Sequence, residues 1–191
     1  FSQRNDAMKS DEVFSYSKDF LQEIIDDLIK LKIQKLSNPK SNHFKNRLKT
    51  LMGKNLEEKH FTDLVSLEDS DLREKILDQF NNNRNERSKI LGEDQSKEIE
   101  KRILLQSIDV NWKSHIQYLE QLRQVVGLRS YGQRDPLVEY KKEAFDLFSN
   151  LLEKLKLDYI TVLMNLKVVE KIKDEEKIEE KKTDPKFIGK K

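Results

Sequence analysis

Two long stretches of the sequence repeat apolar residues every three or four positions, and only the segment 127–136 separates them. The first repeat predicts a helix from about Ser96 to Val126, and the second a helix that begins at Pro136 or Leu137. Such spacing places each repeat on one helix face, called its seam here. Helices of similar length with a short connection fold back as an antiparallel hairpin. The predicted structural residues of the two seams are Trp112, Leu119, Leu122, Tyr140 and Phe148.

The connecting segment, GLRSYGQRDP, predicts a loop at the tip of this hairpin. It contains two of the five glycines and one of the three prolines. Tyr131 offers a large amphipathic contact surface, and its neighbours Arg129, Gln133 and Arg134 offer hydrogen-bond donors. These side chains either contact another polypeptide without sequence preference, or Tyr131 folds back and caps the two helices. The chemistry of these side chains favours neither interpretation over the other.

The rest of the chain also reads as helical, so the predicted fold class is all-α. Residues 10–92 predict a small helical domain, with a first helix from about Val13 to Leu36, a short helix ended by Gly53, a helix capped by Ser70, and a break at Gly92. Residues 1–9 resemble the end of a helix that starts outside the chain. Residues 171–191 are charged and lack a seam, which predicts a disordered tail.

Composition argues against several classes of function. No glycine cluster of the kind that binds nucleotide phosphates occurs, and the chain has no cysteine for a thiolate metal site. His43, His60 and His115 do not have the spacing of metal ligands. With 37 Lys and Arg against 35 Asp and Glu, the formal charge of +2 disfavours a nucleic-acid binder. We therefore expect no catalytic, cofactor or metal site in this segment.

One region of the hairpin carries a collinear set of motifs. In order they are Leu105-Gln106-Ser107-Ile108-Asp109 with Trp112, Leu122-Arg123, Leu128-Arg129-Ser130-Tyr131-Gly132-Gln133, Asp135-Pro136-Leu137, Glu139-Tyr140-Lys141 and Ala144-Phe145. This order closely resembles the SecA family, the motor ATPases of the bacterial preprotein translocase. Ser114 and Ser130 differ from the residues usual in the family. The resemblance follows the whole chain but is specific only from about residue 99 to 166.

The resemblance implies a division of the chain and a role for the tip. Residues 1–9 would end the long scaffold helix, 10–92 would form the helical wing domain, 93–170 the two-helix finger with its tip loop at 127–136, and 171–191 a charged linker. Tyr131 would grip the preprotein, with Arg129, Gln133 and Arg134 as supporting contacts. The hairpin would also regulate the ATPase.

The resemblance further implies partners and cofactors outside this segment. The partners would be the SecYEG channel, unfolded preprotein, other SecA domains, an anionic membrane surface and a possible second copy, but not nucleic acid. The parent motor would work in the cytoplasm, peripherally on the bacterial inner membrane. ATP and Mg would bind domains of the parent that are not part of this chain. The zinc-binding tail of many family members would also lie outside it. We expect the parent to be an ATP-hydrolysing enzyme and this segment alone not to be one.

Two other functions remain open at this point. The chain could be a free-standing helical adaptor that binds partner helices through its seams. It could also bind nucleic acid through the Arg-Tyr loop, although the balanced charge disfavours that interpretation.

Overall fold

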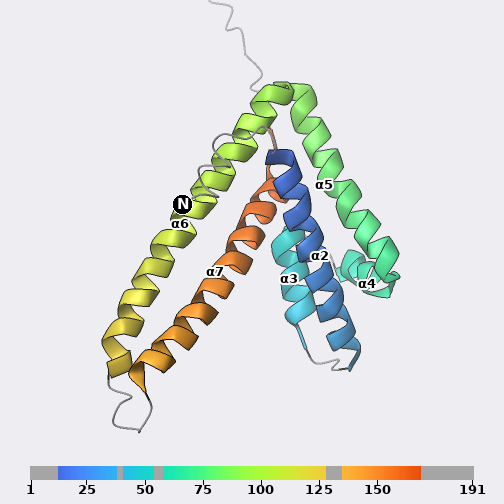
Figure 1. Ribbon diagram of the computed structural model, residues 1–191. Helices are drawn as coiled ribbons and strands as arrows, with labels where there is room; N and C mark the ends of the chain where they lie inside the picture. Colours follow the sequence, from blue (N-terminus) through green and yellow to red (C-terminus); the bar gives the residue numbers. More distant parts are fainter. Residues whose placement is uncertain (1–12, 38–40, 54–57, 128–134, 169–191) are drawn as a thin grey trace, which may run out of the picture.

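The computed structural model describes residues 13–37, 41–53, 58–127 and 135–168, and within these residues it contains helices and no strand (Figure 1). The predicted all-α class is confirmed. The predicted tail, residues 171–191, lies outside the described residues. The helices are α2 (Val13–Ser37), α3 (His43–Met52), α4 (Glu58–Ser66), α5 (Asp69–Leu91), α6 (Glu93–Val126) and α7 (Pro136–Asn165).

The predicted antiparallel hairpin is formed by α6 and α7, which lie side by side (Figure 1). α6 has 34 residues and α7 has 30, so each spans more than about 40 Å at about 1.5 Å per residue. α6 begins at Glu93, a few residues before the expected start. Its end at Val126 and the start of α7 at Pro136 agree with the sequence pattern.

The remaining helices form a small unit at one end of the hairpin. α2 and α3 lie beside the C-terminal half of α7, and α5 leads back to the start of α6 at a sharp corner (Figure 1). That corner is Gly92, whose φ of +86° is a backbone conformation that other residues rarely adopt.

The start of α5 differs from the expectation that Ser70 caps it. The helix begins at Asp69, and Glu68 stands at the cap position without a capping side-chain bond. The Ser70 hydroxyl instead donates to the Asp71 carboxylate at 3.2 Å. Acidic side chains in the first turn favour this end of the helix, because they face the positive end of its dipole.

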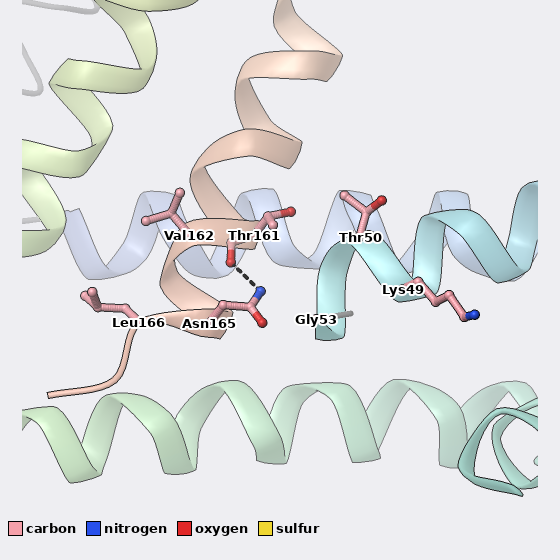
Figure 2. Close-up of a pocket in the computed structure, with 7 residues that line it drawn as sticks. All are labelled: Lys49, Thr50, Gly53, Thr161, Val162, Asn165 and Leu166. Carbon is pink, nitrogen blue, oxygen red and sulfur yellow. Dashed lines mark hydrogen bonds between the residues drawn. The ribbon is translucent and has the colours of Figure 1, made fainter. Parts of the chain in front are cut away.

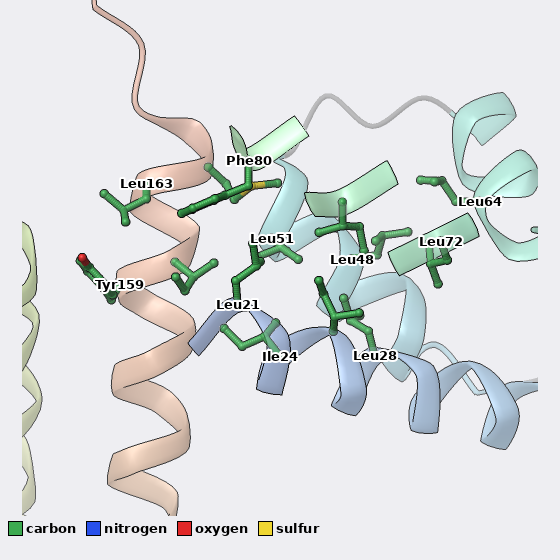
Figure 3. Close-up of a cluster of buried hydrophobic side chains, with 14 of the residues drawn as sticks. Leu21, Ile24, Leu28, Leu48, Leu51, Leu64, Leu72, Phe80, Tyr159 and Leu163 are labelled. Carbon is green, nitrogen blue, oxygen red and sulfur yellow. The ribbon is translucent and has the colours of Figure 1, made fainter. Parts of the chain in front are cut away.

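One hydrophobic core joins the small unit to the hairpin (Figure 3). Tyr159 and Leu163 of α7 are fully buried, and the Phe20 ring meets the Tyr159 ring edge-on at 6.2 Å. Ile160 of α7 is fully buried as well. The fully buried members from α2, α3, α4 and α5 include Leu21, Ile25, Leu28, Phe44, Leu48, Leu51, Leu64, Leu72, Ile76 and Phe80. The C-terminal half of α7 is thus part of this core, whereas its N-terminal half extends away from it towards the tip.

None of the helices in the described ranges has the length and apolar character that crossing a membrane requires.

Candidate functional site

The predicted seam residues occupy the contact between α6 and α7 to different degrees. Leu122 is buried, and Leu119 and Tyr140 are half-buried. Trp112 and Phe148 are 41% and 42% exposed, so a large part of each ring faces solvent. The shaft of the hairpin is therefore a narrow packed seam with aromatic rings at its margin.

A buried histidine lies between those two rings. The His115 ring is 5.5 Å from Trp112 and 5.9 Å from Phe148, measured between ring centroids. Its side chain is almost fully buried, and this burial lowers the pKa of the imidazole below its usual value. His115 is therefore a packed residue, and its burial favours the neutral imidazole.

The seam also contains a polar residue that the sequence argument did not single out. Asn111 is 3% exposed, and its Nδ2 atom donates to the Asp158 carboxylate of α7 at 3.0 Å. Lys154 of α7 donates to the Asn111 Oδ1 atom at 3.0 Å. A buried Asn in a helix seam favours one register, because a shift leaves its amide unpaired. The signal that could have identified it is its spacing, three residues after Ile108 and four before His115.

The predicted tip contacts Arg129, Tyr131, Gln133 and Arg134 lie outside the described residues. The two helix ends that carry this loop are described. Val126 is buried at the end of α6, and Asp135 caps the start of α7, with its Oδ1 atom accepting from the Leu137 amide at 2.8 Å. Pro136 then occupies the first helical turn, where its fixed φ suits a helix.

Large apolar side chains are exposed along the hairpin from its middle towards the tip. Phe145 is 69% exposed, and Phe148 and Leu152 follow it at spacings of three and four residues on one face of α7. Trp112 and Ile116 are one turn apart on α6, and the Trp112 and Phe148 rings flank His115. We call these five residues the distal stripe: Trp112, Ile116, Phe145, Phe148 and Leu152. Exposed large apolar side chains that recur along a helix pair in this way are typical of a binding face.

A hollow of about 620 Å³ lies at the other end of the hairpin, between α3 and α7 (Figure 2). Its lining is mostly apolar, and among the described residues that line it Lys49 alone is charged. The Asn165 amide lies at its centre and donates to the Thr161 carbonyl at 2.8 Å. The described part of this lining includes no carboxylate or histidine that could act as an acid or base. Across the described ranges, no group of His, Asp and Glu side chains could hold a metal ion.

Comparisons with known proteins match almost the whole chain. The family model of the SecA Wing and Scaffold domain matches residues 1–167. The protein translocase subunit SecA of Pelagibacter ubique is 62% identical over 170 residues, which is 89% of this chain and 20% of that protein. The subunits named SecA of Caulobacter vibrioides and Hyphomonas neptunium are each 32% identical over 171 residues, 88% of this chain. The chain spans about a fifth of the length of these relatives.

Proposed function

This chain belongs to the SecA wing and scaffold family, and from that premise we propose that it forms the wing and the two-helix finger of a protein-translocating motor. The motor would couple ATP hydrolysis to the movement of preproteins through SecYEG. The finger would contact the preprotein with Tyr131, supported by Arg129, Gln133 and Arg134. It would also regulate the ATPase of the parent motor.

The distal stripe is the observation that carries this proposal. Exposing an apolar side chain such as Phe145 to water is unfavourable, and its burial by another chain lowers the free energy. Four of the five residues, all but Leu152, lie on the half of the hairpin that extends from the core towards the segment 127–136, which contains Tyr131. A stiff pair of helices with a buried seam would carry such a surface to a substrate without bending.

The chemistry of ATP would belong to other parts of the motor. We propose that ATP and Mg bind domains outside this chain, and that the motor works at the cytoplasmic face of the bacterial inner membrane. The purified 191-residue chain should therefore show no ATP turnover above a buffer blank. Sustained hydrolysis by the chain alone would contradict this assignment of roles.

A disulfide cross-link tests the contact of the tip with substrate. Tyr131→Cys is introduced into the full-length motor, made cysteine-free elsewhere, and a preprotein with single cysteines is stalled in the channel. We expect a disulfide that requires both ATP and SecYEG. Lys75→Cys, at an exposed position on α5, is the matched control and should not cross-link. An active motor that forms no disulfide from residue 131 would leave Tyr131 as a cap on the helices.

The distal stripe also supports a second candidate, a helical adaptor that binds an amphipathic partner helix. Such a helix would cover Trp112 and Phe148 along the shaft rather than contact the tip. In that case the cross-links to preprotein would fail, and a stable complex with a folded helical partner would protect Trp112 from quenching by acrylamide. A tip cross-link without such protection favours the finger.

A further inference from the structure

Four helices meet at the base of the hairpin around the buried carboxylate of Glu100. Arg84 of α5 donates to it from Nε at 2.9 Å and from Nη2 at 2.8 Å, and Arg87 donates from Nη2 at 3.1 Å. The Ser17 hydroxyl of α2 donates to the Glu100 Oε2 atom at 3.4 Å, the same oxygen that accepts from Arg84 Nη2. Glu100 and Ser17 are fully buried and Arg87 is 2% exposed. We call these four residues, Ser17, Arg84, Arg87 and Glu100, the Glu100 hub.

The hub extends to the C-terminal end of α7. Arg87 uses its second terminal nitrogen, Nη1, to donate to the Leu163 carbonyl at 2.9 Å. Asn83, one turn earlier on α5, donates to the Met164 carbonyl at 2.8 Å. The last four carbonyls of a helix have no hydrogen-bond donor within that helix. Here α5 provides donors for two of those in α7, the carbonyls of Leu163 and Met164. Both helices of the hairpin are therefore fixed to the wing at one place.

These bonds are directional, whereas the apolar core around them is not. Apolar contacts depend on buried area and tolerate sliding of one helix over another. Each bond in the hub is made at a single relative placement of α5, α6 and α7. Buried ion pairs often add little net stability compared with apolar residues, because removing the charges from water costs free energy. Selecting one arrangement is the role that remains for them.

A small change of angle at the hub becomes a large displacement at the tip. From Glu100 to Val126, α6 runs for about 39 Å at about 1.5 Å per residue. A rotation of about 10° at its base would therefore move its end by about 7 Å. The position of the tip depends on how firmly the hub holds this angle.

We propose that the Glu100 hub is a rigid joint that makes the wing and the hairpin move as one body. A force on the wing is then transmitted to the tip with little loss to bending at the base. The proposal concerns mechanics within the chain and does not depend on what the tip contacts.

The distance between the wing and the distal hairpin tests this joint. The chain has no cysteine, so Gln34→Cys on α2 and Gln121→Cys on α6 provide two unique spin-label sites, both exposed. They lie on different arms of the structure (Figure 1). Electron spin resonance then gives the distribution of distances between the labels in the 191-residue chain.

Arg87→Lys is the central variant because it keeps the charge but loses the planar fork whose two terminal nitrogens bind Glu100 and the Leu163 carbonyl in a fixed geometry. The matched control is Arg102→Lys on α6. It alters an exposed ion pair with Glu98, which lies one turn earlier on α6. We expect the distance distribution to broaden or shift in Arg87→Lys and to stay unchanged in Arg102→Lys. Circular dichroism should show equal helix content in both.

Glu100→Gln is a second variant that removes the central charge with little change of shape. If it unfolds, Arg87→Lys decides the question alone. The proposal is overturned if Arg87→Lys keeps the narrow distribution of the parent chain. It is also overturned if Arg102→Lys broadens the distribution as much as Arg87→Lys does, since the hub would then have no special role.

Discussion

The amide side chain of Asn165, in the last turn of α7, fills the space beside Gly53 in which a Cβ atom would lie. Its Oδ1 atom is 2.6 Å from that position (Figure 2). Its Nδ2 atom donates to the Leu51 carbonyl at 3.1 Å, so α7 provides a donor for the end of α3. The hairpin and the small helical unit are thus joined at Gly53, whose positive φ favours glycine.

We expect Gly53→Ala to destabilise the chain more than Gly92→Ala does. Both glycines have a positive φ that strains other residues, by about 1–3 kcal/mol each. A Cβ at residue 53 would also displace Asn165 and break its bond to Leu51, whereas nothing lies within 4 Å of a Cβ at residue 92. Urea unfolding should give an extra loss of about 1 kcal/mol for Gly53→Ala. Equal losses would mean that Asn165 moves aside freely.

Asp135→Ala should loosen the start of α7 beside the tip loop. The variant removes the carboxylate that accepts from the Leu137 amide, and loss of such a cap costs about 1 kcal/mol. Asp135→Asn keeps an acceptor at this place and is the control. Amide hydrogen exchange of residues 137–140 should speed up in Asp135→Ala and much less in Asp135→Asn. Unchanged exchange in both would show that Pro136 alone sets the start of the helix.

Most of the fold could be predicted because helix periodicity is a local property. Gly53 and Gly92, with Pro136 at the start of α7, marked helix ends that the structure places within a few residues of the expected positions. The hub could not be predicted in this way. Glu100 and Arg87 look like ordinary charged residues of solvated helix faces, and only the corner between α5 and α6 brings them together in the interior.

The candidate site was predictable only in part, for a related reason. Spacing identified the seam but not how much of each ring the other helix can cover. Two helices bury a narrow strip between them, so wide side chains at its margin, such as Trp112, stay partly in water. Asn111 also has the spacing of a seam residue, three residues after Ile108 and four before His115, but the sequence analysis did not single it out. The contact role of Tyr131 stays a prediction, since that residue lies outside the described ranges.

Trp112→Ala should cost less stability than Tyr159→Ala. Tyr159 is fully buried in the core, and truncating a buried aromatic ring costs about 3–5 kcal/mol. Trp112 is 41% exposed, so we expect a loss of about 1–2 kcal/mol from the smaller apolar area it buries. Circular dichroism at increasing urea concentration compares the two variants. A loss for Trp112→Ala as large as that for Tyr159→Ala would mean that another segment covers the ring.

His115 should make the chain less stable as the pH falls. Burial lowers the pKa of its imidazole below the ordinary value of 6.5, so the unfolded chain binds the proton first. The stability that neutral His115 provides is complete above pH 6.5 and is lost as the pH falls below it. Urea unfolding at a series of pH values should show this slope, and His115→Gln should remove it. The same slope in His115→Gln would assign the effect to other groups.

Phe145→Ser should impair the motor without destabilising the chain. Its ring is 69% exposed, so its loss should change the free energy of unfolding by no more than about 0.5 kcal/mol. If the distal stripe contacts preprotein, the full-length motor with this substitution should transport preprotein more slowly and give a weaker cross-link from residue 131. Ile90→Ser, at a 44% exposed apolar position on α5, is the matched control and should leave transport unchanged. Equal slowing by both substitutions would mean that transport responds to the loss of any exposed apolar side chain. It would contradict a specific contact between the distal stripe and preprotein.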